Sequence, residues 1–85
     1  MPTLYAMVQR GTPVPPSRQL AALLRARIES GELPPGTQLP SILSLSQEHQ
    51  IATVTVRKAL GILRQEGLIE AVPGYGTFVS GASPE

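Results

Sequence analysis

The chain has 85 residues and no cysteine, which excludes a disulfide framework and a zinc site built on thiolates. Its net charge is only +1, from seven Lys and Arg against six Asp and Glu, so a nucleic-acid binder must be argued from where the charges lie. No apolar run approaches the roughly 18 residues of a membrane span and no secretory signal pattern is present, so we expect a single cytoplasmic domain without a membrane segment.

Residues 1 to 16 hold a short apolar group, Leu4, Tyr5, Met7 and Val8, followed by a glycine and three prolines. The prolines separate this segment from the helix that follows. Two interpretations stay open: a flexible N-terminal tail, or an arm that packs on the domain or on a second copy of the chain.

A first helix is predicted from residue 17 to residue 30, with Ser17 as its N-cap and Gly31 as its stop. Its apolar face consists of Leu20, Leu23, Leu24 and Ile28. Its polar side carries Arg18, Arg25 and Arg27. These arginines form either a solvated face or a set of phosphate contacts.

The segment Leu33-Pro34-Pro35-Gly36 provides the Pro-Gly pair for the two central positions of a type II turn, and residues 37 to 39 can form only a very short strand. A second helix then begins at Ser41, a further N-cap candidate, and ends near Gln50. His49 stands alone, with no metal-ligand or catalytic set at suitable spacing, so we expect it on the surface of this helix.

Residues 53 to 66 predict the helix on which the domain is organised. One face is apolar at the 3.6-residue period and consists of Val56, Ala59, Leu60 and Leu63. Its N-terminal turns instead carry small, hydroxyl and basic side chains: Thr53, Val54, Thr55, Arg57 and Lys58. Ile51 and Ala52 join it tightly to the second helix, which is the helix-turn-helix arrangement, and we interpret its first turns as inserting into a polyanion.

The C-terminal part predicts a β-hairpin, with strands at 68 to 72 and 77 to 80. Pro73 and Gly74 suit the two central positions of a type II turn, and Gly76 lets the backbone bend as the second strand starts. Residues 81 to 85 are expected to be a frayed tail.

This order of elements resembles a winged helix, and the residues resemble those of the GntR family of bacterial transcription regulators. The similarity is carried by RARIESGELPPG at 25 to 36, LPS at 39 to 41, TVRKAL at 55 to 60, EGLI at 66 to 69 and GYGTFV at 74 to 79. These motifs lie at consistent spacing across residues 17 to 80. The resemblance implies an α+β, mainly α, winged helix-turn-helix with three helices and a C-terminal β-hairpin wing.

The chain departs from the family pattern at three basic positions. The family usually has Glu-Arg where Ile42 and Leu43 stand, an Arg where this chain has Thr53 and Val54, and a basic residue where Tyr75 stands at the wing tip. Affinity for DNA should therefore be lower, or carried by other contacts, than in a typical member. The family normally carries a C-terminal effector-binding domain, and this sequence ends after the wing, so the resemblance implies a DNA-binding domain only, either a naturally minimal regulator or the N-terminal part of a longer one. We expect no cofactor and no small-molecule effector within this chain.

The resemblance implies a repressor that binds double-stranded DNA, with the recognition helix, residues 53 to 66, in the major groove and the wing, residues 73 to 77, at the backbone or minor groove. Because a single winged helix buries only about 600 to 1,000 Å² on DNA, we expect a homodimer on a palindromic operator. The predicted DNA-binding residues are Ser41, Thr53, Val54, Thr55, Arg57, Lys58, Gly74 and Tyr75. Arg57 suits a guanine or a phosphate, Lys58 suits a phosphate, and Thr53 is alternatively only an N-cap.

Two other functions stay open. A winged helix can serve as a protein-interaction module, here through Val54, Ile62 and Tyr75, which we expect to be exposed. An accessory DNA-bending factor of a mobile element would use the same DNA contacts. An enzyme is disfavoured, because no paired carboxylates, catalytic triad or metal set is present.

Overall fold

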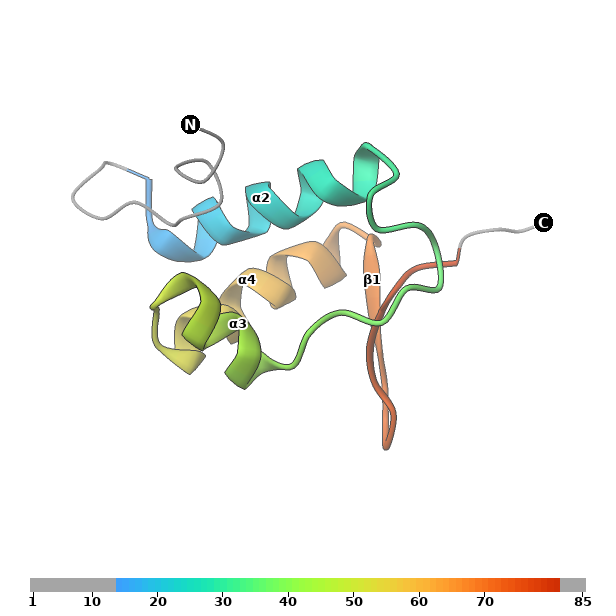
Figure 1. Cartoon of the computed structure of the whole chain (residues 1–85). Helices are drawn as coiled ribbons and strands as arrows, with labels where there is room; N and C mark the ends of the chain where they lie inside the picture. Colours follow the sequence, from blue (N-terminus) through green and yellow to red (C-terminus); the bar gives the residue numbers. More distant parts are fainter. Residues whose placement is uncertain (1–13, 82–85) are drawn as a thin grey trace.

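The computed structural model describes residues 14 to 81, as three helices followed by an antiparallel hairpin (Figure 1). The elements are α2 (Pro16–Glu29), α3 (Ile42–His49), α4 (Thr53–Gln65), β1 (Ile69–Val72) and β2 (Gly76–Val79). This confirms the predicted order of three helices and a C-terminal hairpin, each within about one residue of its expected bounds. The apolar group at residues 4 to 8 and most of the tail lie outside the described residues.

The first helix begins earlier than predicted. Pro16 occupies its first turn and Pro15 precedes it as the N-cap without a side-chain hydrogen bond, so the prediction of Ser17 as N-cap is wrong. Proline suits this position because its φ is already helical and its missing N–H would have no partner there. The Pro15 carbonyl accepts the N–H groups of Arg18 and Gln19, each at 3.0 Å. The helix ends as predicted at Gly31, whose φ is +88°.

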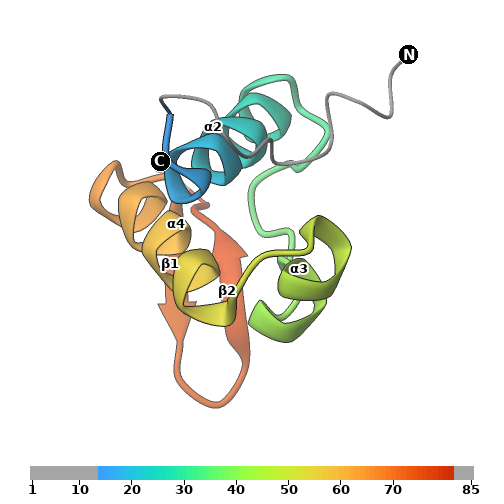
Figure 2. The same cartoon turned by 90° about the vertical axis from the view of Figure 1, so that its left-hand side faces the viewer.

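The core lies where α2 crosses α4 and where α3 and the hairpin close on the same helix (Figure 2). All four apolar residues predicted for the core face of α4 are buried. The other buried apolar residues are Leu20, Ala21, Leu24, Leu39, Leu45, Ile51, Ile69 and Val79. Ile62, which was expected to face outward, is instead half-buried against this core. It lies three residues after Ala59, so it flanks the buried stripe of α4.

His49 is also placed differently from the prediction. Its side chain is only 4% exposed, and neither ring nitrogen has a hydrogen-bond partner within residues 14 to 81. The reason is positional, because His49 follows Leu45 by four residues and thus shares its inward face of α3. Gln50 then takes a left-handed conformation, with φ +57°, and turns the chain into the buried Ile51. The polar side chain of His49 is therefore buried at the end of α3, just before the turn of the helix-turn-helix.

The hairpin is tied to the body by the linker between α2 and α3. Within the hairpin, β1 and β2 pair Ile69 with Val79 and Ala71 with Thr77 on the inner face. Leu39 N–H donates to the Thr77 carbonyl, and Val79 N–H donates to the Thr37 carbonyl, each at 2.8 Å. In place of the very short strand predicted at residues 37 to 39, the structure has an isolated antiparallel β-bridge between Gln38 and Phe78, beside a sheet of two strands.

The tip of the hairpin is a four-residue turn that also accepts a hydrogen bond from the linker between α2 and α3. Tyr75 N–H donates to the Val72 carbonyl at 2.9 Å and Gly74 has a φ of +83°, in agreement with the predicted turn. Gln38 Nε2 donates to the Tyr75 carbonyl at 2.8 Å. The linker side chain therefore sets the position of the tip.

Gly76→Ala should destabilise the domain by about 1 to 3 kcal/mol, because its φ of +127° strains any L residue and a Cβ would lie 2.7 Å from Gln38 Nε2. Gly74→Ala is the matched control, since φ is +83° there but the space around a Cβ is open. Urea unfolding should show the larger loss at Gly76, and Gln38→Ala should recover part of it. Equal losses at the two glycines would contradict the contact with Gln38.

Candidate nucleic-acid interface

Three predicted contact regions lie on one side of the molecule. In Figures 1 and 2, α2 lies on one side, while α3, the first turns of α4 and the hairpin tip lie on the other. Recognition of a duplex by a helix and a hairpin together requires this arrangement, since both must reach the same ligand.

The surface of α4 divides into stripes. Val54 and Lys58, four residues apart, face outward and are exposed, with Val54 at 55%. Arg57 and Arg64, seven residues apart, lie on the flank that faces the hairpin, where both line the same cleft. Arg57 and Lys58 are adjacent in the sequence, but they thus project in different directions.

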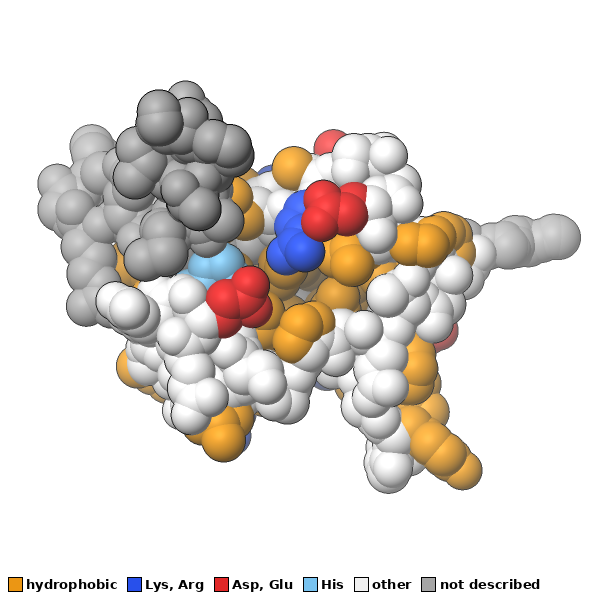
Figure 3. Space-filling view, in the orientation of Figure 1, with side chains coloured by type: hydrophobic (Ala, Val, Ile, Leu, Met, Phe, Trp, Pro, Cys, Tyr) orange, Lys and Arg blue, Asp and Glu red, His pale blue; other side chains and the backbone are white. Residues whose placement is uncertain are grey.

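The charges of the chain are unevenly distributed. Helix α4 carries three basic residues, Arg57, Lys58 and Arg64, and no acidic one, and none of the three is ion-paired among residues 14 to 81. On the face shown in Figure 3, by contrast, the most prominent basic side chain adjoins an acidic one. A net charge near zero therefore coexists with a basic α4, the distribution expected of an anion-binding helix.

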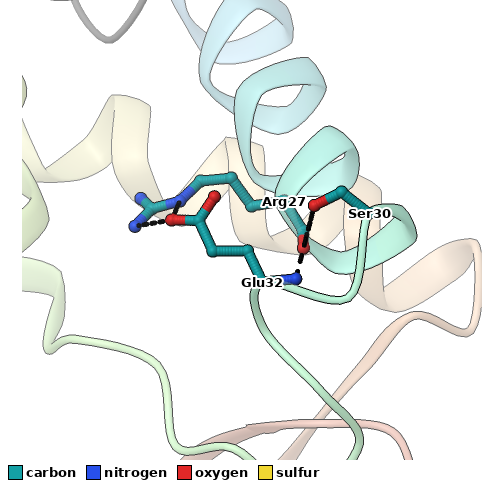
Figure 4. Close-up of polar contacts among 3 residues, drawn as sticks. All are labelled: Arg27, Ser30 and Glu32. Atoms are coloured by element: carbon teal, nitrogen blue, oxygen red, sulfur yellow. Dashed lines mark hydrogen bonds and ion pairs between the residues drawn. The ribbon is translucent and has the colours of Figure 1, made fainter.

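Two arginines of α2 are engaged in ion pairs within the domain. Arg25 binds Glu66 through two hydrogen bonds, of 2.9 and 2.7 Å, and so joins α2 to the end of α4. These hydrogen bonds lower the pKa of the Glu66 carboxyl and raise the pKa of the Arg25 guanidinium. Arg27 pairs with Glu32 at 3.0 Å in the turn that follows α2 (Figure 4). Neither of the two possibilities left open for these arginines includes such internal pairing.

The start of α4 is free of side-chain capping. Ala52 is the N-cap, and no side chain caps the helix, so the alternative interpretation of Thr53 as N-cap is wrong. Thr53 and Thr55 are half-buried, and Val54 between them is exposed. The Thr53 hydroxyl is therefore not used for capping the helix that it begins.

The start of α3 is capped as predicted. Ser41 Oγ accepts the N–H of Ser44 at 3.0 Å, which confirms Ser41 as the N-cap. Its hydroxyl proton remains a donor. Two residues later, Leu43 is 59% exposed at a position where the family usually has a basic residue.

The hairpin tip presents Tyr75, which is 74% exposed, with Gly74 beside it. Hydrophobic side chains follow one edge of the projecting hairpin (Figure 3), and Val72, Tyr75 and Phe78 line a shallow hollow on this outer face. Because Ile62 is half-buried, the apolar surface predicted for a protein-interaction module is reduced to Val54 and Tyr75.

Two residues of the interface were not predicted. Gln38 holds the hairpin tip, and Arg64 lines the cleft beside Arg57. The seven-residue spacing of the two arginines is a sequence signal for a shared side of α4, but the neighbouring hairpin is visible only in the structure.

The described residues contain no group of three His, Cys, Asp or Glu side chains that could hold a metal ion. None of the helices within residues 14 to 81 is both long and apolar enough to cross a membrane.

Comparison with known proteins agrees with this geometry. HTH-type transcriptional repressor NagR of Bacillus subtilis is 38% identical over 73 residues, which cover 86% of this chain and 30% of NagR. The mannosyl-D-glycerate transport/metabolism system repressor MngR of Escherichia coli is 42% identical over 62 residues, which cover 73% of this chain and 26% of MngR. The chain thus spans less than a third of the length of these relatives.

Among solved structures, the DNA-binding domain of AraR in complex with operator ORX1 matches with a TM-score of 0.83 and 29% identity, over 87% of this chain and 94% of that one. The fold is therefore that of winged helix-turn-helix DNA-binding domains, and the relatives are regulators of transcription rather than enzymes. The family model described as "Bacterial regulatory proteins, gntR family" matches residues 8 to 79. The chain belongs to the GntR family of bacterial transcription regulators.

Proposed function

We propose that this domain binds double-stranded DNA in a sequence-specific manner and acts in repression of transcription. The observation that carries the proposal is α4: three basic residues without a counter-ion in the described part of the chain, on a helix whose first turns lie on the same side as the hairpin tip. The names of NagR and MngR as repressors, and the operator bound to AraR, support the same function.

The outward stripe of α4 is the part that reads bases. Val54 suits apolar contact with a thymine methyl group, and the Thr55 hydroxyl at the edge of the stripe suits a base edge or a phosphate. Lys58, one turn further along the stripe, supplies a point charge for the backbone. Thr53, which does not cap α4, donates to the backbone where the helix enters the major groove.

The flanking elements fix the orientation of α4 in the groove. Ser41 lies at the start of α3, where the first N–H groups of the helix favour an anion, and its hydroxyl donates to a phosphate oxygen there. Gly74 and Tyr75 approach the neighbouring backbone or minor groove, with Tyr75 offering a ring and a hydroxyl in place of a charge. We expect a weaker salt dependence at the wing than a basic tip would give.

A pair of domains on a palindromic operator completes the proposal. One winged helix buries only about 600 to 1,000 Å² on DNA, and two half-sites one helical turn apart provide the affinity and specificity that a regulator needs. We place this homodimer in the cytoplasm, where its DNA ligand is found.

Selection of bound duplexes from a random DNA pool, repeated at two salt concentrations, tests the function. The expected result is enrichment of an inverted repeat whose half-sites are centred about one helical turn apart. A single half-site would contradict the dimer and leave the DNA-binding function in place. No enriched sequence at either salt concentration would overturn the proposed function.

A further inference from the structure

An open cleft of about 280 Å³ lies between α4 and the inner face of the hairpin. Its apolar wall consists of Leu60 from α4 and of Ile69 and Ala71 from β1. Arg57 and Arg64 line it from α4, and Thr77 lines it from β2. No acidic residue lines the cleft.

The two arginines line the same cleft from positions two turns apart on α4. They are seven residues apart, which is two helical turns, and a helical side chain leans toward the N-terminus of its helix. Arg64 therefore extends over the turn that holds Leu60, in the direction of Arg57. Neither arginine is ion-paired within residues 14 to 81. Two positive charges beside an apolar wall, without a counter-ion, favour binding of an anion.

The position of the cleft indicates which anion it receives. In a duplex, one phosphodiester backbone separates each major groove from the adjacent minor groove. If the first turns of α4 occupy the major groove and the hairpin tip reaches the minor groove, that backbone lies between α4 and the hairpin. The apolar wall then contacts deoxyribose carbons, while the two guanidinium groups face the phosphate oxygens.

We propose that this cleft binds one DNA phosphodiester, with Arg57 and Arg64 donating to its free oxygens and the Thr77 hydroxyl donating a third hydrogen bond. The inference rests on the proposed function and deepens it. Arg57 is thereby assigned to the backbone rather than to a guanine, so base reading falls to the outward stripe of α4. Arg64 supplies a cation that the wing tip, with Tyr75, does not provide.

Arg64→Ala tests the assignment on a duplex recovered from the selection and on a shuffled duplex of the same length. Binding should weaken about tenfold on both, and the salt slope should fall by about 0.9, because one of the cations that face the backbone is lost. Arg64→Lys should keep the slope. Arg18→Ala, which removes an exposed arginine from α2 instead, should change neither quantity. Thermal unfolding of each variant without DNA checks that folding is intact.

A scan with single methylphosphonates, each of which removes one backbone charge, locates the contact. The wild-type chain should lose affinity at the phosphates that separate the two grooves, and Arg64→Ala should show a smaller loss at one of them, because Arg57 and Thr77 still donate to that phosphate. A wild-type salt slope in Arg64→Ala, an unchanged methylphosphonate profile, or an altered ranking of sequences would overturn the assignment. Failure of the wild-type chain to bind any duplex would overturn the proposed function itself.

Discussion

Replacing Arg57 and Lys58 together by alanine should weaken duplex binding at least about 100-fold and lower the salt slope by about two, because two cations that face the DNA backbone are lost. Both side chains are exposed and neither belongs to the core, so the variant should unfold at the wild-type temperature. The measurement is a titration of the selected duplex at several salt concentrations.

A charge-matched control is available on α2. The double variant Arg18→Ala and Arg27→Ala also removes two positive charges, but from α2 on the opposite side of the molecule. Arg27 belongs to an exposed ion pair, which contributes little to stability. This control should bind nearly as the wild type does. Unimpaired binding by the Arg57 and Lys58 variant would remove α4 as the DNA-binding helix, and the protein-interaction hypothesis would then be favoured.

Much of the fold could be predicted because its signals are local. The apolar period of α4 identified all four of its buried residues, since burial of one helix face imposes that period directly. Proline and glycine located the turns at residues 34 to 36 and 73 to 74 because they restrict or extend φ at their own positions. The order of elements followed from these two kinds of signal.

The errors occur where residue type and position disagree. His49 is polar, which favoured the surface, but it stands four residues after Leu45 and so faces the interior. Ile62 is apolar and was placed outside, but its spacing from Ala59 brings it against the core. In both cases the helical period, rather than the chemistry of the side chain, determined the outcome.

The interface was harder to predict than the core because it depends on elements far apart in the sequence. Arg25 meets Glu66 across 41 positions, which turns a candidate phosphate contact into an internal ion pair. Gln38 reaches Tyr75 across 37 positions and fixes the hairpin tip. The cleft at Arg64 likewise exists only once the hairpin is packed beside α4. No local pattern contains such information.

Leu63→Ala should destabilise the domain by about 2 to 5 kcal/mol, because the Leu63 side chain is 0% exposed and its removal leaves a cavity in the core. Domains of this size have a total stability of only about 5 to 10 kcal/mol, so this loss removes a large share of it. Urea unfolding followed by circular dichroism measures the loss. Leu43→Ala is the matched control: the same atoms are removed from a residue that is 59% exposed, and the change should stay within about 0.5 kcal/mol.

The Leu63→Ala variant also separates the effect of folding on DNA affinity from the effect of direct DNA contacts. Leu63 lies on the core side of α4 and contributes no phosphate contact, so Leu63→Ala should lower apparent DNA affinity only by the fraction of unfolded chain. Its salt slope should equal that of the wild type, in contrast to the slope of the Arg57 and Lys58 variant. Added duplex should raise its unfolding temperature, because DNA binds the folded form alone. A changed salt slope in Leu63→Ala would mean that the core residues of α4 influence how its basic side chains meet the backbone.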